Sequence, residues 1–191
     1  MSKKVFILLG HPDTDSMCRE FADAYGEGAR ESGCEVRRTN LGDMVFDPIL
    51  HKGYRVIQEL EPDLKKFQED IRWCDHLVII YPSWWSTMPA LLKGLFDRAW
   101  LPGFAYKFLP SGLIWTKLLK GRTATVFVTS DALPILARFI FGDNVNEIRD
   151  GILWFAGFKT KIKKCGPMRK ISPEHRLEWV SWFKHIGGKI Y

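Results

Sequence analysis

The chain has 191 residues, of which 46% are hydrophobic and 26% charged, with a formal net charge of +6. This balance indicates one folded domain over residues 1–191 and excludes a disordered or collagen-like chain. The opening MSKKVFILLG is too short for a secretory signal, and prolines, serines and a lysine interrupt the apolar segment near residue 84, so we expect a cytoplasmic protein with no membrane span.

The first part of the chain alternates strands and helices. The apolar run 5–9 predicts a buried strand, and the loop GHPDTD separates it from a helix with apolar residues at helical spacing. The predicted elements of this part are a strand at 5–9, a helix at 16–31, a strand at 35–38 and a helix at 63–73. Residues 41–61, which contain Pro48 and Gly53, predict no regular element.

The segment 77–108 is the most informative. It begins as an uncharged strand, 77–81, and continues after Pro89 as a helix over 90–100. Between them lie two adjacent tryptophans, Trp84 and Trp85, at the carboxyl end of a strand, where open α/β sheets bind ligands. Two roles are consistent with these rings: contact with a flat aromatic ligand, or packing in the core or a dimer contact.

The last part of the chain repeats the alternation. An irregular connection over 101–121 precedes a strand at 123–129, and the apolar segment 133–158 predicts a helix, a turn at Gly142–Asp143 and a second helix. A strand at 160–164 and a helix at 173–186 complete the chain.

This alternation predicts a three-layer α/β sandwich with a five-stranded parallel sheet. The common strand order for such a sheet is 2-1-3-4-5, and its ligands bind where the order reverses, between the first and third strands. We therefore expect a site formed by the loops 10–18 and 82–88, with the loop 129–132 beside them.

The first of these loops suits a phosphate. Ser16 is a candidate N-cap, and a helix start offers free N–H groups and a positive dipole end. The loop carries neither GxGxxG nor GK[ST], so a Rossmann pyrophosphate site and a Walker A site are disfavoured. Asp15 should face outward or cap an N–H group, because a carboxylate that points inward would repel the phosphate. His11 is either a turn residue or a ligand contact.

The spacing of the cysteines and histidines and the distribution of charge argue against a metal site, a disulfide framework and a nucleic-acid site. The four cysteines and five histidines have no spacing typical of zinc or of a disulfide framework, so we expect reduced thiols and no metal. Six basic residues between Lys159 and Lys170, without an acid among them, account for the net charge. Alternation at 159, 161 and 163 favours a protected edge strand over a nucleic-acid site, and attraction of an anionic cosubstrate is a third possibility.

Two segments, GHPDTDS and YPSWWSTMPALLKGLFDRAWLPGFAY, resemble the signatures of the NAD(P)H:quinone oxidoreductases with a flavodoxin-like fold. The second signature is close to P-x-x-W-x-x-x-P-A-x-L-K-G-x-x-(D/E)-R-x-x-x-x-G-x-A-(F/Y). The residues that match it are Pro82, Trp85, Pro89, Ala90, Leu92, Lys93, Gly94, Asp97, Arg98, Gly103, Ala105 and Tyr106. The resemblance extends from Val5 to about Thr129 and weakens beyond.

The resemblance implies a homodimeric flavoenzyme with FMN or FAD, which passes hydride from NAD(P)H to a quinone or related electrophile in ping-pong fashion. It implies that the flavin phosphate and ribityl chain contact His11, Ser16, Met17 and Cys18. It implies that Pro82, Ser83, Trp84 and Trp85 line the isoalloxazine. It also implies that Thr129 and Ser130 form the third cofactor-binding loop, with Asp131 close to the flavin.

Departures from the family affect the proton donor. Relatives commonly have Thr-Gly-Gly in the third loop, where this chain has Thr129-Ser130-Asp131-Ala132, and some carry a Tyr and a His soon after it. Residues 133–141 contain neither, so we expect solvent to supply the proton, with Asp131 as a weak side-chain alternative. No catalytic side chain is assigned.

Two other functions compete with that of a flavoenzyme, and the number of large apolar residues predicts a dimer. An electron carrier of the flavodoxin type is disfavoured because those carriers are acidic. The chain also resembles the ancillary flavoprotein subunits of glutathione-gated potassium efflux systems, so a regulatory role stays open, with residues 132–158 as the partner contact. Trp84, Trp100, Trp115 and the apolar segment 133–158 exceed what we expect the core to bury, which predicts a homodimer.

Overall fold

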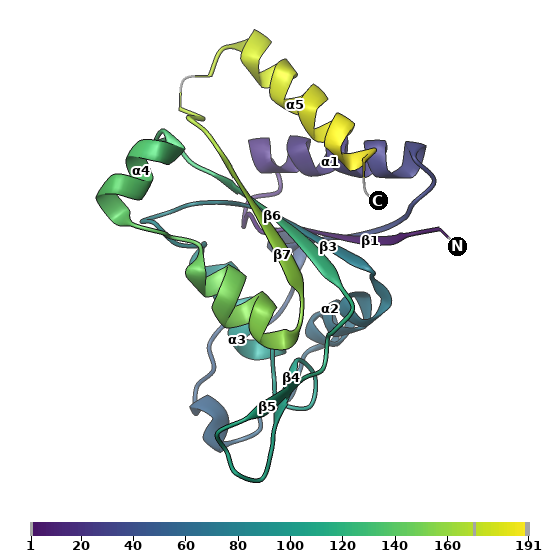
Figure 1. Ribbon diagram of the computed structural model, residues 1–191, viewed down its shortest axis with the longest axis vertical. Coiled ribbons are helices and arrows are strands. Elements are labelled where there is room, and N and C mark those ends of the chain that lie inside the picture. The colour runs from purple at the N-terminus through teal and green to yellow at the C-terminus, as the bar shows by residue number, and fades with distance from the viewer. Residues whose placement is uncertain (1, 170, 190–191) are drawn as a thin grey trace.

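A parallel sheet forms the centre of the molecule in the computed structural model, which describes residues 2–169 and 171–189 (Figure 1). Its order is β2-β1-β3-β6-β7, which confirms the predicted 2-1-3-4-5. The strands are β1 (Lys4–Leu9), β2 (Glu35–Asn40), β3 (His76–Pro82), β6 (Thr123–Thr129) and β7 (Lys159–Cys165).

Helices cover both faces of the sheet. On one face lie α1 (Met17–Glu31) and α5 (Pro173–Gly187), which pack along each other (Figure 1). On the other lie α2 (Pro62–Trp73), α3 (Ala90–Ala99) and the π-helix η3 (Glu147–Trp154). The helix α4 (Pro134–Phe141) lies beyond the carboxyl ends of the strands.

The central strands form because both of their faces are apolar. In β1, Val5, Ile7 and Leu9 point toward α1, whereas Phe6 and Leu8 point toward α2, and all five are fully buried. Burial of one such side chain contributes roughly 1.5–3 kcal/mol. Two apolar clusters, one on each face, therefore hold the loops at the strand ends in fixed positions.

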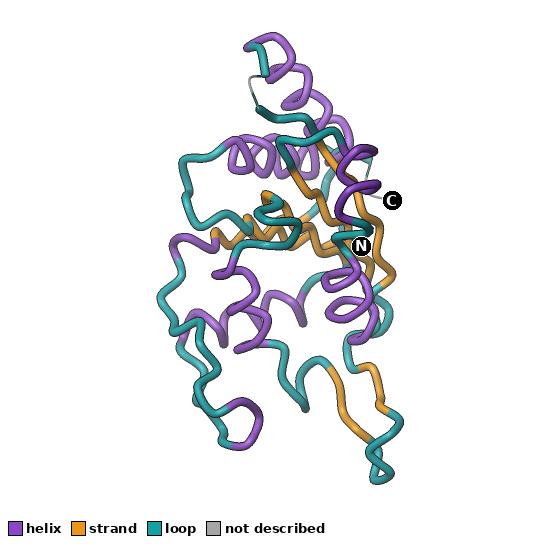
Figure 2. Tube along the Cα trace, turned by 90° about the vertical axis from the view of Figure 1, so that its left-hand side faces the viewer, coloured by secondary structure: helices purple, strands orange, loops and turns teal. Residues whose placement is uncertain are grey.

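The connection between α3 and β6 holds a structure that the sequence did not predict. An antiparallel hairpin, β4 (Tyr106–Phe108) with β5 (Trp115–Lys117), extends away from the sheet (Figure 2). Trp100 was predicted to lie at an interface, and this is wrong: it is 6% exposed and its indole N–H donates to the Ile152 carbonyl at 3.0 Å.

A buried arginine organises the irregular segment 44–61, which contains the short 3₁₀ turn η2 (Gly53–Arg55). Arg98 on α3 is 1% exposed, and its guanidinium donates to the carbonyls of Asp47 and Glu59, the latter at 2.8 Å. It also donates to both carboxylate oxygens of Glu61, at 3.2 and 2.9 Å. One side chain thus fixes the backbone of this segment at two points and pairs with the carboxylate at its end.

No helix within residues 2–169 and 171–189 combines the length and the apolar character needed to cross a membrane.

Candidate functional site

Three loops meet at the carboxyl ends of β1, β3 and β6. The Gly10 N–H donates to the Ile80 carbonyl at 2.8 Å, and the Ser83 N–H donates to the Thr129 carbonyl at 2.7 Å. Beneath them the Cys18 Sγ lies 3.4 Å from the Thr129 Oγ1. The three loops predicted to form a site are therefore joined to one another.

The first loop is ordered by short-range hydrogen bonds. The Asp13 N–H donates to the His11 Nδ1 at 2.9 Å, and the Asp13 carboxylate accepts from the Asp15 N–H at 2.8 Å. Asp15 is exposed, as predicted. The His11 ring meets the edge of the Trp84 ring with centroids 5.5 Å apart, so His11 is both a turn residue and a link to the tryptophan loop.

Ser16 precedes α1 in the extended conformation of an N-cap, but its hydroxyl caps nothing. Its Oγ is buried and has no hydrogen-bond partner in the described part of the chain. An unpaired buried hydroxyl costs about 1–3 kcal/mol, so this position is suited to a ligand that accepts a hydrogen bond. A phosphate at the start of α1 is such a ligand, because the first N–H groups of a helix also favour an anion.

Met17 and Cys18 follow Ser16 on the first turn of α1. Cys18 is 3% exposed, and burial raises the pKa of its thiol to about 11 despite the hydrogen bond with Thr129. The thiol is therefore neutral and serves packing rather than nucleophilic chemistry. Met17 is half-buried against the apolar cluster between α1 and the sheet.

The tryptophan loop is a tight turn with an unusual backbone. The N–H groups of Trp84 and Thr87 donate to each other's carbonyls, at 2.9 and 3.1 Å. Trp85 and Ser86 at its tip have φ of 51° and 63°, the left-handed region that residues other than glycine rarely adopt. Such strain, about 1–2 kcal/mol per residue, is typical of functional sites.

The turn directs its tryptophans away from the core. Trp85 is 99% exposed and Trp84 is 44% exposed. Core packing within one subunit is thereby excluded for Trp85, for which ligand contact and subunit contact stay open, whereas Trp84 is half-buried against His11.

The segment around η3 supports the tryptophan loop. The Glu147 carboxylate accepts from the Thr87 hydroxyl and, at 3.4 Å, from the Met88 N–H. The Asn144 side chain donates to the Ser83 Oγ at 3.3 Å. Sequence reasoning missed Glu147 and Asn144, because each lies about 60 residues from its partner along the chain.

A hollow of about 570 Å³ lies between the tryptophan loop, the third loop and α4. Its volume suits a small-molecule site. Its lining includes Ser83, Trp85, Ser130, Asp131, Phe141 and Lys164. Four of these were predicted as flavin-binding residues: Ser83, Trp85, Ser130 and Asp131. Lys164 was not predicted, although its position at the carboxyl end of a predicted strand was a usable signal.

The third loop is bound to the end of β7. The Ser130 N–H donates to the Cys165 carbonyl at 2.9 Å, and the Ser130 hydroxyl donates to the Ala132 carbonyl at 2.9 Å. Thr129 is 5% exposed beneath the loop, in register with Pro82 of β3. Asp131 is exposed at the rim of the hollow.

The predicted phosphate residues lie outside the lining of the hollow. His11 and Ser16 are not part of the hollow's lining, and the edge contact between His11 and Trp84 connects the two regions. An extended ligand with a phosphate at one end and a flat ring at the other matches this arrangement. Across residues 2–169 and 171–189, no three His, Cys, Asp or Glu side chains are grouped to hold a metal ion.

The chain is similar to known proteins in sequence and structure. A family model described as the flavodoxin-like fold matches residues 3–160. An uncharacterized NAD(P)H oxidoreductase of Escherichia coli, YcaK, is 29% identical over 110 residues, which cover 55% of this chain and 56% of that protein. The chain thus matches little more than half the length of that relative.

Two solved structures share the whole fold. An NAD(P)H:quinone oxidoreductase from Methanothermobacter marburgensis has a TM-score of 0.83 at 25% identity, with 100% of both chains covered. An FMN-dependent NADH-azoreductase from Bacillus anthracis, solved with FMN, has a TM-score of 0.74 at 19% identity and covers 98% of this chain and 99% of that one. The second likeness shows the fold alone.

Proposed function

Because this chain belongs to the family with the flavodoxin-like fold, we propose that it is a flavin-dependent NAD(P)H oxidoreductase that reduces quinones or related electrophiles. The observation that carries the proposal is the buried Ser16 hydroxyl at the start of α1, which has no hydrogen-bond partner among the described residues. The names of the relatives in E. coli and M. marburgensis support the reaction class.

The residues fit a flavin in two parts. His11, Ser16, Met17 and Cys18 would surround its phosphate and ribityl chain. Pro82, Ser83, Trp84 and Trp85 would contact the isoalloxazine, and Thr129, Ser130 and Asp131 would form the third loop at the flavin. FMN and FAD share the phosphate, the ribityl chain and the isoalloxazine, so these residues fit either flavin.

A bound flavin would accept hydride from NAD(P)H and deliver it to the acceptor. The protein's own part is to position the two substrates and to limit water. The exposed Trp85 ring offers a stacking surface, and Phe141 on α4 also lines the hollow. Residues 133–141 carry no Tyr, His, Asp or Glu, so solvent supplies the proton and Asp131 is the nearest carboxylate.

Reconstitution tests the cofactor. The protein is incubated with FMN or FAD and passed over a gel-filtration column, and the bound flavin is identified by its absorption and its mass. One flavin per chain is expected. If neither flavin elutes with the folded protein, the proposal is wrong.

Steady-state kinetics test the reaction. NAD(P)H oxidation with a quinone should give parallel double-reciprocal plots, because both substrates use one site in turn. Intersecting plots would overturn the single-site scheme. No oxidation in the presence of bound flavin would favour the regulatory flavoprotein instead. The net charge of +6 argues against an electron carrier of the flavodoxin type, because those carriers are acidic.

A homodimer is part of the proposal. Large apolar side chains are exposed on the short helix α4 and its approach: Leu133, Ile135, Leu136, Phe139, Ile140 and Phe141. Exposed apolar patches mark interfaces, and two-fold dimers are the commonest closed assembly. Sedimentation at micromolar concentration is expected to give twice the chain mass. A monomer that binds flavin and is active would contradict this.

A further inference from the structure

A second hollow, which we call the lysine pocket, lies at the amino ends of β3, β6 and β7, on the face covered by α1 and α5. Its volume is about 410 Å³, within the range of small-molecule sites. Its lining runs from Thr123 and Lys159 as far as Phe127 and Lys163, and it shares no residue with the lining of the hollow beside the tryptophan loop. The lysine pocket is therefore separate from the proposed active site.

The floor of the lysine pocket is polar where a covered sheet is normally apolar. His76 on β3 pairs with Thr123 on β6, which pairs with Lys159 on β7, so the three side chains form one row across the sheet. In the next row Thr125 pairs with Lys161. Buried parallel strands usually carry apolar residues at such positions. Here the side chains of His76 and Thr125 are polar and only 8% exposed.

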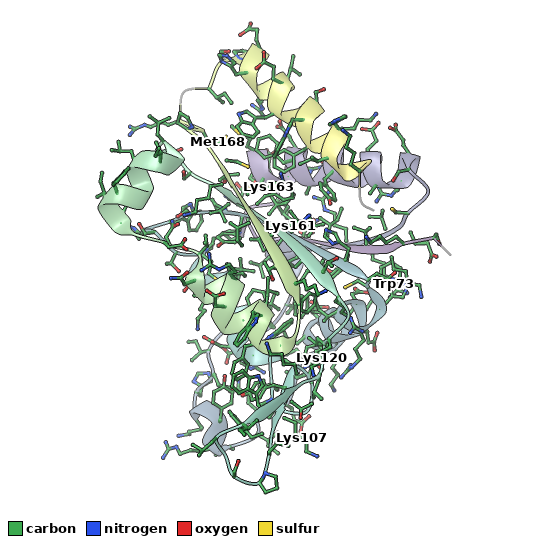
Figure 3. The ribbon with its side chains drawn as sticks, in the orientation of Figure 1. Trp73, Lys107, Lys120, Lys161, Lys163 and Met168 are labelled. Atoms are coloured by element: carbon green, nitrogen blue, oxygen red, sulfur yellow. The ribbon has the colours of Figure 1, made fainter. Side chains whose placement is uncertain are left out.

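The walls of the lysine pocket carry positive charge without compensation. Five lysines line it, and no aspartate or glutamate does; these are Lys3, Lys159, Lys161, Lys163 and Lys189. None of the five takes part in an ion pair between described residues. Figure 3 shows Lys161 and Lys163 along β7, the edge strand beside α5. Like charges gathered around one hollow repel each other, and an anion placed among them relieves that repulsion.

We propose that the lysine pocket binds a small, multiply charged phosphate compound of the oligophosphate class. Five ammonium groups match a ligand with several negative charges, and lysine is a common point-charge partner of phosphate. The hydroxyl of Thr125 lies at the floor as a further donor.

A nucleic acid strand fits this site less well than a small molecule. Strands bind in extended grooves that offer aromatic rings for stacking. The lysine pocket is bounded instead by Tyr25 of α1 and by Ile186 and Lys189 at the end of α5. Tyr25 is 3% exposed and its ring is packed against Phe127, so it offers no free face to a base.

His76 gives a readout inside the lysine pocket. Its Nδ1 lies 2.7 Å from the Thr123 Oγ1, and burial together with Lys3 and Lys161 lowers the pKa of its imidazole to about 4. The groups around it are the lysines named above and Tyr25, with no carboxylate in the lining. An anion in the pocket favours the imidazolium, so ligand binding should raise the pKa of His76.

The probe for the experiment is inorganic triphosphate, titrated calorimetrically into the protein as purified, with whatever flavin it carries. Lys161→Gln should raise the Kd about tenfold, the effect of losing one charge-assisted contact. Lys65→Gln is the matched control, since Lys65 is exposed on α2 on the opposite face and the variant has the same net charge. The control should leave the Kd unchanged.

Two further measurements separate a built site from general attraction to a basic protein. Thr125→Val changes no charge and should still weaken triphosphate binding severalfold. In proton NMR, the pKa of His76 should rise with triphosphate, and the resonance is assigned with His76→Gln. Flavin content and NAD(P)H oxidation of Lys161→Gln should equal those of the unmodified protein, so failure here is distinct from failure of the proposed function.

Three results would overturn the inference. Equal effects of Lys161→Gln and Lys65→Gln would mean that only the net charge matters. A His76 pKa insensitive to saturating triphosphate would place the anion elsewhere. Single-stranded RNA of ten nucleotides that binds more tightly than triphosphate, and is weakened by Lys161→Gln, would identify a nucleic-acid surface instead.

Discussion

Replacement of Ser16 by alanine should have opposite effects on the flavin-free protein and on flavin binding. The Ser16 hydroxyl is buried without a partner, so its removal relieves a cost of about 1–3 kcal/mol. The usual penalty for loss of a capping serine, about 1 kcal/mol, does not apply, because this hydroxyl caps no N–H group. We expect the flavin-free variant to gain about 1 kcal/mol, or a rise in Tm of roughly 2–4 °C for a chain of this size.

In the flavin complex the sign reverses. If the hydroxyl donates to the phosphate, the variant loses a hydrogen bond to a charged group, about 1.5–3 kcal/mol, and the flavin Kd rises roughly ten- to hundredfold. Ser16→Asp should weaken flavin binding further, because it places a carboxylate beside the phosphate. Thermal unfolding of the flavin-free protein and fluorescence titration with flavin measure both quantities.

Ser32→Ala is the matched control at the other end of α1. The Ser32 hydroxyl donates to the Ala29 carbonyl at 2.8 Å, so its removal should lower stability by about 1 kcal/mol and leave the flavin Kd unchanged. A loss of stability in Ser16→Ala like that of Ser32→Ala would mean that the Ser16 hydroxyl is paired in solution. An unchanged flavin Kd would show that the phosphate lies elsewhere.

Three further predictions concern the surroundings of the two sites. Ser86→Gly should stabilise the flavin-free protein by about 1 kcal/mol in urea unfolding, since glycine adopts the φ of 63° without strain; destabilisation would refute strain at this turn. Glu147→Ala should lower stability by about 1–3 kcal/mol and speed hydrogen exchange of the Met88 N–H, because two donors of the tryptophan loop lose their acceptor; unchanged exchange would show that Glu147 does not hold the loop. The pKa of His76 is about 4 in the folded protein against an ordinary 6.5, so the unfolded chain takes up the proton first. The contribution of His76 to the free energy of unfolding is therefore complete above pH 6.5 and is lost as the pH falls toward 4. The loss is on the order of 3 kcal/mol. His76→Gln should flatten this part of the curve of unfolding free energy against pH.

The sheet was predictable because each strand carries its own signal. The apolar run of β6 predicts its bounds to the residue, and the alternating lysines of β7 correctly indicate an edge strand. The hairpin β4–β5 escaped prediction, because its strands are three residues long and give too short a pattern. Trp100 was wrongly assigned to an interface, because composition does not show that a backbone carbonyl of η3 accepts a hydrogen bond from its indole N–H.

The candidate site was predictable to the extent that topology determines it. Strand order alone brings the loops after β1, β3 and β6 together, and with them Ser16, Ser83 and Ser130. What escapes sequence reasoning is the support from distant segments. Glu147 holds the tryptophan loop through side-chain hydrogen bonds, and no local periodicity reports such a contact. The left-handed backbone at Trp85 is equally invisible, because the sequence places no glycine there.

The anchoring of residues 44–61 by Arg98 has a consequence for proteolysis. The segment exposes Val45, Ile49, Val56 and Ile57, and two of its carbonyls depend on the one buried guanidinium. Lysine in place of Arg98 would keep the charge but lack the planar fork that reaches both carbonyls and the Glu61 carboxylate together. The segment would then open to trypsin at Lys52 and Arg55 while the sheet stayed folded. The rate of tryptic cleavage after Lys52 and Arg55 thus measures how strongly the ordered conformation of the eighteen residues 44–61 depends on the Arg98 side chain.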